Sequence, residues 1–217
     1  MKKLLFSAAA VSAALLFVTG TASADIGQRH TFVLGAERLG GVQYYRNKVG
    51  NNKVTGVNMS VLYSSTGGGQ VIPSVVPRVG ADFFVIDALS LGGSIGYYGT
   101  SAEVTRDGNN VSADLGTVGG FAFAPRVGWL VDLPKDWSMW LRGGPALFIG
   151  QLGNDQDLWH FQLDVEVLFN FLMTESFGLS IGPAMAIPIT GNLEKGNRDF
   201  DATSLSIGGV AGFFGAF

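Results

Sequence analysis

The chain has 217 residues, with 14 Lys and Arg against 17 Asp and Glu and a formal net charge of −3 at pH 7. This acidic balance argues against a nucleic acid partner, because nucleic-acid-binding domains carry a basic surface. The absence of cysteine excludes a disulfide framework and a thiolate metal site. Charged residues make up 14% of the chain, against about 25% in soluble domains.

Residues 1–24 have the features of a secretory signal peptide. Lys2 and Lys3 form the charged region, an apolar run follows, and the small residues 22–24 form a cleavage site. We therefore expect a signal peptide over residues 1–24 and a single mature domain over residues 25–217.

The mature sequence has no apolar run long enough for a membrane helix, although the mean hydropathy of the whole chain is positive at +0.31. It is also rich in glycine, with 32 in the whole chain. Low charge and hydrophobicity spread over alternate positions are typical of a transmembrane β-barrel. We predict an all-β, closed, antiparallel up-and-down barrel.

Eight segments have the composition of membrane strands. The first covers residues 32–46, three strand–turn–strand pairs follow, and the last strand ends the chain. The pairs are 77–86 with 89–99, 121–131 with 137–150, and 159–171 with 177–190, and the last strand is 204–217. Their short turns contrast with longer polar stretches, predicted as loops, at residues 105–110, 153–157 and 192–201. Short periplasmic turns and longer external loops are typical of outer-membrane barrels.

Residues 54–65 also resemble a strand, and counting them alone would give an odd number. An even number leaves both termini on the periplasmic side, as in bacterial single-chain barrels. We therefore interpret residues 54–65 as an extension of the first external loop above the membrane. The alternative is a ten-stranded barrel with a further strand in residues 70–76.

Residues 159–171 show the alternation most clearly. Alternate residues of a strand lie on opposite faces, so one face here is apolar and the other carries Asp164 and Glu166. The apolar positions are Trp159, Phe161, Leu163, Val165, Val167, Phe169 and Phe171. In a soluble β-sandwich this apolar face would point inward, whereas in a membrane barrel it faces lipid. The low charge of the chain favours the membrane barrel.

The residues on the opposite face of each predicted strand predict a charged lumen. The predicted lumen residues are three arginines, Arg78, Arg126 and Arg142, and four carboxylates, Glu37, Asp82, Asp164 and Glu166. Charges removed from water must be paired, and eight strands enclose just enough room for side chains. We expect a salt-bridge network that plugs the lumen rather than an open pore.

The chain ends in Phe217, with Phe213 and other apolar residues before it in the last strand. With this ending, the mature chain resembles the small bacterial outer-membrane β-barrel proteins of the OmpA/OmpX type, without a periplasmic domain. The resemblance implies an outer-membrane location in contact with lipids and lipopolysaccharide. It also implies recognition of the terminal strand by the barrel assembly machinery. We expect a monomer with a structural or surface-interaction role.

His160 is the candidate for an alternative, catalytic function. Some barrels resembling this one modify lipid A with a His, a Ser and an acidic partner, but a triad is recognised by geometry and no spacing here identifies a nucleophile. We therefore predict no enzymatic activity, no cofactor and no metal, since two histidines without cysteine offer few ligands. The alternatives are a lipid A-modifying enzyme using His160, or a narrow channel if the barrel has ten or more strands.

Overall fold

A computed structural model describes residues 26–61, 64–65, 76–106, 111–134, 137–152, 156–196 and 198–217. All regular secondary structure in these ranges is β-strand. No helix in the described residues is long and apolar enough to cross a membrane. The strands are β1 (Phe32–Val49), β2 (Asn52–Val61), β3 (Ser64–Ser65), β4 (Arg78–Ile86), β5 (Leu89–Arg106), β6 (Val111–Leu133), β7 (Trp137–Leu152), β8 (Gln156–Leu172), β9 (Phe177–Lys195) and β10 (Arg198–Ala216). The predicted signal peptide lies outside the described residues and stays a prediction.

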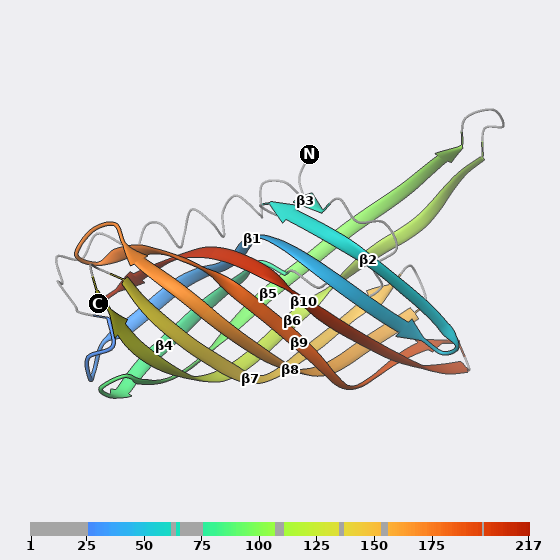
Figure 1. The fold of residues 1–217 in the computed structure, drawn as a ribbon. Helices are drawn as coiled ribbons and strands as arrows, with labels where there is room; N and C mark the ends of the chain where they lie inside the picture. The colour runs from blue at the N-terminus through green and yellow to red at the C-terminus, as the bar shows by residue number, and fades with distance from the viewer. Residues whose placement is uncertain are drawn as a thin grey trace.

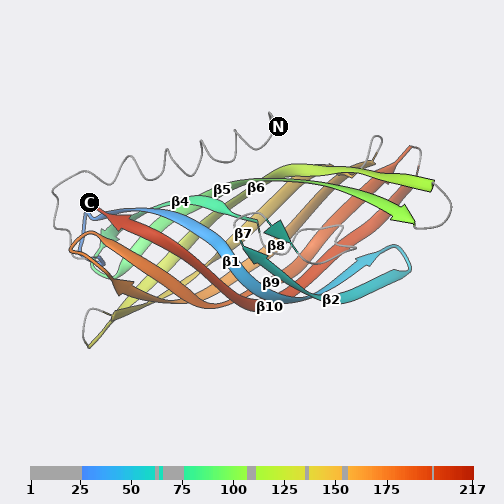
Figure 2. The same ribbon diagram turned by 90° about the horizontal axis from the view of Figure 1, so that it is seen from above.

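The sheet closes on itself as an antiparallel barrel (Figures 1 and 2). Each strand from β4 to β10 pairs with the next, and the ring closes because β1 pairs with both β4 and β10. The ring therefore has eight strands, as predicted, and the ten-stranded alternative is wrong. We call the end at which Val33 pairs with Ala216 the terminal end. The opposite end, with the β1–β2 turn at Gly50, is the far end.

One position in the wall is shared by two strands. β4 pairs with Phe32–Glu37 of β1, and β2 pairs with Gly40–Val49 on the same edge, because β10 occupies the other edge of β1. β2 thus continues the position of β4 toward the far end. The interpretation of residues 54–65 as a loop is wrong for the part that forms β2, which is a strand hydrogen-bonded to β1, but β2 does not add to the ring of eight strands, as predicted. β4 does not reach Gly40–Val49 of β1, so the backbone N–H and C=O groups on that edge would be unpaired without β2.

The predicted loop at 192–201 is also largely wrong, and of the predicted loop at 105–110 the structure describes only Thr105 and Arg106, which belong to β5, while 107–110 lie outside the described residues. β5 continues to Arg106 and β6 begins at Val111, while β9 and β10 meet close to Gly196, whose φ of +59° suits a tight turn. These polar stretches read as loops because they lack an apolar face. A strand that projects into water needs no such face and can extend the hairpins beyond the apolar band.

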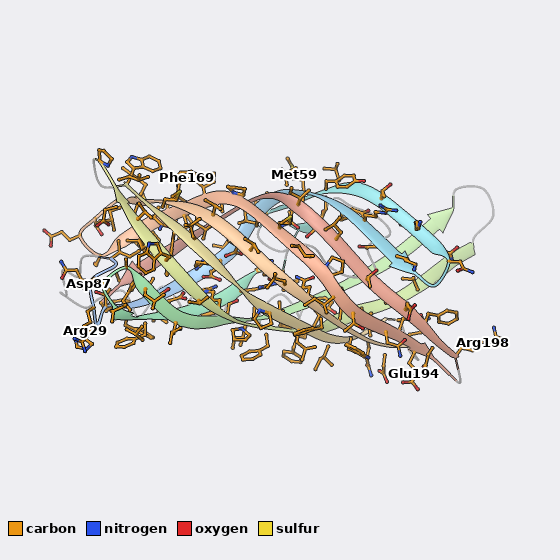
Figure 3. All side chains as sticks on the ribbon, turned by 60° about the horizontal axis from the view of Figure 1, so that its bottom comes forward. Arg29, Met59, Asp87, Phe169, Glu194 and Arg198 are labelled. Carbon is orange, nitrogen blue, oxygen red and sulfur yellow. The ribbon has the colours of Figure 1, made fainter. Side chains whose placement is uncertain are left out.

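The side chains have the predicted polarity, apolar outside and polar inside (Figure 3). In β8, Trp159 and Phe169 face outward at 41% and 38% exposure, whereas the residues at the other alternate positions, His160, Gln162, Asp164, Glu166, Leu168 and Asn170, are buried. The five aromatic residues predicted for the interfacial girdles are exposed as well, although Tyr97 lies in the middle of β5, because that strand continues to Arg106. They are Tyr44, Tyr97, Trp129, Trp137 and Trp159.

Candidate functional site

An irregularity in β1 places two successive charged residues inside the barrel. Opposite β10, the register advances from Ala36↔Phe213 to Gly40↔Ala211, so β1 contains extra residues at this point. Arg38 adopts a left-handed φ of +52°, as bulged residues do. Glu37 and Arg38 are therefore both buried, at 8% and 4% exposure, although alternation would place them on opposite faces.

The carboxylate of Glu37 joins two arginines from neighbouring strands. Arg126 on β6 binds it in a fork, with Nη1–Oε2 and Nη2–Oε1 distances of 2.6 Å each. Arg142 on β7 donates from Nη1 to Glu37 Oε1 at 2.7 Å. Arg126 also holds Asp82 on β4 through Nε–Oδ1 at 3.0 Å and through Nη2 and Oδ2. Forked Arg–carboxylate pairs fix geometry as well as charge.

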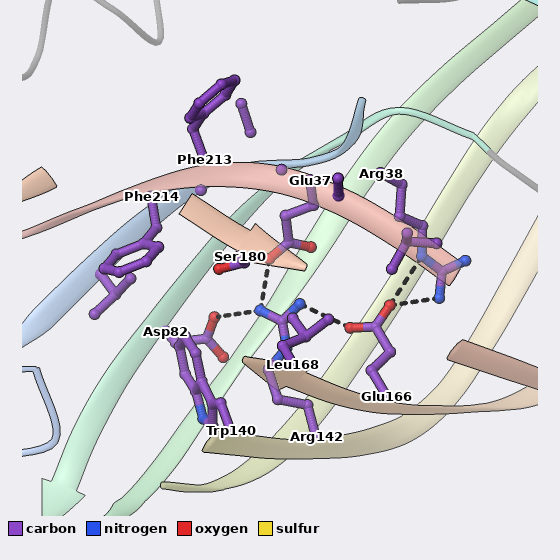
Figure 4. Close-up of a pocket in the computed structure, with 16 residues that line it drawn as sticks. Glu37, Arg38, Asp82, Trp140, Arg142, Glu166, Leu168, Ser180, Phe213 and Phe214 are labelled. Atoms are coloured by element: carbon purple, nitrogen blue, oxygen red, sulfur yellow. Dashed lines mark hydrogen bonds and ion pairs between the residues drawn. The ribbon is translucent and has the colours of Figure 1, made fainter. Parts of the chain in front are cut away.

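Arg38 organises the other half of the network. Its Nη2 lies 2.7 Å from Glu166 Oε1 and 3.1 Å from Asp164 Oδ2, both on β8. Asp164 also binds Arg78 Nη1 at 2.8 Å, and Glu166 Oε2 binds Arg142 Nη2 at 2.7 Å. Arg142 thus links the two halves, and Figure 4 shows its position between Glu37 and Glu166.

The network contains four guanidinium groups and four carboxylates, so its formal charge balances. All eight side chains are nearly inaccessible to solvent, from 2% to 10% exposed. In such an environment each ion pair interacts strongly, and removing one partner leaves an uncompensated buried charge. The arrangement holds β1, β4, β6, β7 and β8 together across the lumen.

Small residues make room for these long side chains. A Cβ added to Gly80 on β4 would lie 2.7 Å from Arg126 Nη2, so any larger residue there would displace the Arg126–Glu37 pair. Ser94 and Ala184 line the same lumen on β5 and β9. The predicted lumen pattern of small residues beside a few long ones is therefore present.

An apolar layer lies on the terminal side of the network. Ile26, which precedes the first strand, packs inside the barrel with Phe84, Trp140 and Phe214. The Trp140 ring stacks on Phe84 at 5.6 Å, donates from Nε1 to Ser90 Oγ at 3.3 Å, and lies 4.9 Å from the Arg142 guanidinium carbon. The aromatic ring thus joins the apolar layer to the charged layer through a cation–π contact.

Further apolar groups lie on the far side of the network. Val76, Tyr98 and Phe148 form one buried cluster with alanines of β6 and β7, and Leu158 and Leu193 belong to another near the far end. The Phe148 ring lies 5.5 Å from the guanidinium carbon of Arg78. The lumen is therefore layered along its axis, with charged groups between apolar clusters.

His160 is fully buried and engaged by groups that do not form a catalytic triad. Its Nε2 lies 3.0 Å from Gln162 Oε1 and its Nδ1 lies 3.3 Å from the Ala202 carbonyl oxygen. Gln162 in turn donates from Nε2 to Asp164 Oδ1. His160 thus extends the charged network toward the far end through an amide, and within the described residues its hydrogen-bond partners include neither a Ser hydroxyl nor a carboxylate.

The structure brings all seven predicted lumen residues into one network and adds Arg38. Strict alternation in β1 would put Arg38 on the apolar face, where a cation costs about 2–4 kcal/mol at mid-membrane depth. The adjacent charges Glu37 and Arg38 were therefore a usable signal for a bulge. Trp140 was also missed, because a tryptophan in a barrel strand is expected at the outer interface.

The two predicted assembly residues lie at the terminal end. Phe213 faces outward at 42% exposure, and Phe217 follows β10 and exchanges two backbone hydrogen bonds with Phe32, at 2.8 and 2.9 Å. Their role in assembly stays a prediction. Among the described residues, no group of three or more His, Asp or Glu side chains is placed to hold a metal ion.

No protein-family model and no curated protein sequence matches this chain. Among solved structures, it is similar to the outer membrane protein OprG from Pseudomonas aeruginosa, with a TM-score of 0.54 and 11% identity over 89% of this chain and 99% of that one. Neisserial surface protein A (NspA) is another, with a TM-score of 0.48 and 14% identity over 86% of this chain and 97% of that one. The likeness to OprG shows that this chain has the fold of the small outer-membrane β-barrel proteins.

Proposed function

We propose that this protein is an integral barrel of the bacterial outer membrane with a structural or surface-interaction role and a sealed lumen. In this arrangement the terminal end faces the periplasm and the far end faces the exterior. The apolar outward faces of the strands anchor the barrel in lipid, and the hairpins of the far end meet the surroundings. The terminal strand, with Phe213 and Phe217, is the segment that the assembly machinery would recognise.

The layered lumen is the main observation in support of a barrel without an open pore. Two cavities border the charged network, with volumes of about 20 and 10 Å³. About 10–15 Å³ is needed to hold one water molecule, so these cavities correspond to single waters rather than to a channel. Ions would have to break buried ion pairs and then cross apolar layers, and both steps are costly.

The proposal predicts a protein that fractionates with outer membranes and does not conduct ions. A folded barrel migrates differently on a gel before and after boiling, so the purified protein should show heat-modifiable migration. Planar-bilayer recordings of the same sample should show no channel steps. Stable conductance from heat-modifiable protein would contradict the sealed lumen, whereas a detergent-free soluble monomer would contradict the membrane location.

The buried position of His160 predicts that it does not act on lipids. The variant His160→Ala should leave the mass spectrum of lipid A unchanged in cells that express it, compared with cells that express the unaltered protein. Cells without the gene should show the same spectrum, which controls for other enzymes. A lipid A mass that depends on the protein and is lost in His160→Ala would establish the enzymatic alternative.

A further inference from the structure

Three cations gather on the outward face of the β1–β2 hairpin near the far end. Arg46 and Lys48 are exposed positions of β1, and Lys53 is an exposed position of β2. Lys48 and Lys53 are register partners, so their side chains leave the same face. Direct cross-strand neighbours have Cβ atoms about 4.5–5.5 Å apart, and like charges at that spacing repel each other. This cluster therefore favours an anion that can lie between the two lysines.

Within the described residues, the three cations of this cluster have no ion-pair partner. Among the described residues, no carboxylate oxygen lies within the 4.0 Å of an ion pair from Arg46, Lys48 or Lys53. The strand partners across β10 are Leu205 and Thr203, which are uncharged. By contrast, every arginine inside the barrel has a carboxylate partner. Asp201 of β10, two positions from the Lys48 partner Thr203, is an exposed carboxylate beside the cluster, so within the described residues the three cations keep a net positive charge.

Directly below the cluster, the same face of the hairpin is apolar. Tyr44 pairs with Val57 and Val42 pairs with Met59, and these side chains are 45% to 62% exposed. Met59 points away from the wall in Figure 3. The sequence of groups from the far end toward the middle is thus cation, aromatic ring, then aliphatic surface. An amphipathic lipid with an anionic head group and acyl chains has the complementary order.

The charge is not spread evenly around the far end. Glu194 on β9 is the register partner of both Asp157 on β8 and Asp199 on β10, and all three carboxylates are exposed. Arg198 of β10 lies among these carboxylates and Asp201 of β10 lies beside the hairpin, so the described side chains give a net negative charge over β8–β10 and a net positive charge over the β1–β2 hairpin. The asymmetry therefore favours one binding face rather than general attraction to a charged leaflet.

We propose that the face formed by Arg46, Lys48 and Lys53, together with the apolar surface below it, binds the phosphate groups of a phosphorylated glycolipid of the outer leaflet. This inference rests on the proposed outer-membrane location. Arginine and lysine bind phosphate through charge-assisted hydrogen bonds. The acyl chains lie along Tyr44, Val57 and Met59, which fixes the lipid in place and distinguishes the site from one for free phosphate.

Native mass spectrometry of the detergent-solubilised barrel tests the proposal. Bisphosphorylated lipid A is titrated against the unaltered protein, against Lys48→Gln with Lys53→Gln, and against Arg29→Gln with Arg198→Gln. The last variant removes the same charge from exposed positions outside the cluster. The lysine variant should bind about 10- to 30-fold more weakly, since each cation near a membrane surface contributes about a tenfold factor or less. The arginine control should change binding less than about twofold.

Two further probes identify the ligand. Enzymatically dephosphorylated lipid A should bind the unaltered protein as weakly as bisphosphorylated lipid A binds the lysine variant. Inorganic pyrophosphate should not compete at equal concentration. Equal binding of the dephosphorylated lipid, effective competition by pyrophosphate, or equal losses in both variants would each overturn the proposal.

A heat-modifiability gel on each variant separates this inference from the proposed function. If the lysine variant fails to fold, Arg46→Gln alone provides the test, with an expected loss of about fivefold. If the protein is heat-modifiable and lies in the outer membrane but binds bisphosphorylated and dephosphorylated lipid A equally, only the proposed lipid site is wrong. A protein that is neither heat-modifiable nor in the outer-membrane fraction removes the proposed function, and the lipid site with it.

Discussion

Replacing Arg126 with methionine should destabilise the barrel by about 3–5 kcal/mol, the usual loss when one partner of a buried ion pair is removed. Arg126 binds Glu37 in a fork and holds Asp82 through two further hydrogen bonds. Without it, Asp82 retains only Arg142 Nη1 at 3.8 Å, too long for a hydrogen bond. Urea unfolding of the barrel in lipid vesicles measures the free energy of unfolding directly.

A second variant separates charge balance from packing. Arg126→Met combined with Asp82→Asn removes one charge of each sign, so the buried network is again neutral. We expect this double variant to be more stable than Arg126→Met alone, because no uncompensated carboxylate remains at that position. If Arg126→Met lowers the free energy of unfolding by less than about 1 kcal/mol, the guanidinium is solvated and the lumen is not sealed.

The variant Val165→Arg should cost about 2–4 kcal/mol of unfolding free energy, the range for a cation on the lipid face at mid-membrane depth. Val165 lies between Asp164 and Glu166 on β8, but its side chain leaves the opposite, outward face. It therefore marks the level of the charged network on the outside of the wall. Urea unfolding in lipid vesicles measures the cost.

The matched control is Glu194→Arg, at an exposed position near the far end. A cation close to the membrane surface costs only about 0–1 kcal/mol, and this one also relieves the repulsion among Glu194, Asp157 and Asp199. A small effect at both positions would show that the outward face of β8 does not contact lipid. A large effect at Val165 alone supports the orientation that the proposal requires.

Most of the ring could be predicted from the sequence, because a strand has a simple period. In β8, an apolar residue at each alternate position from Trp159 to Phe171 specifies both the strand and its outward face. The same reasoning identified seven of the eight charged lumen residues. It failed in β1, where the bulge at Arg38 interrupts the alternation and turns a second charged residue inward.

The position of β2 could not be predicted either. Residues 54–65 have a strand composition, but composition does not say which edge a strand will pair with. The pairing depends on β4 being too short to cover β1, which leaves Gly40–Val49 with an open edge on one side. Long-range pairing of this kind is decided by the whole ring, and local residue patterns carry no information about it.

The order of amino acids by itself determined a closed all-β wall with an apolar outside and charged side chains inside. Those features follow from alternation and from the cost of burying unpaired charge, and both act on individual strands. Only the tertiary structure decided which charges pair, because Glu37, Arg126 and Arg142 are far apart along the chain and meet through the stagger of three strands. It also decided that Lys48 and Lys53 face each other, because strand register sets which side chains become neighbours.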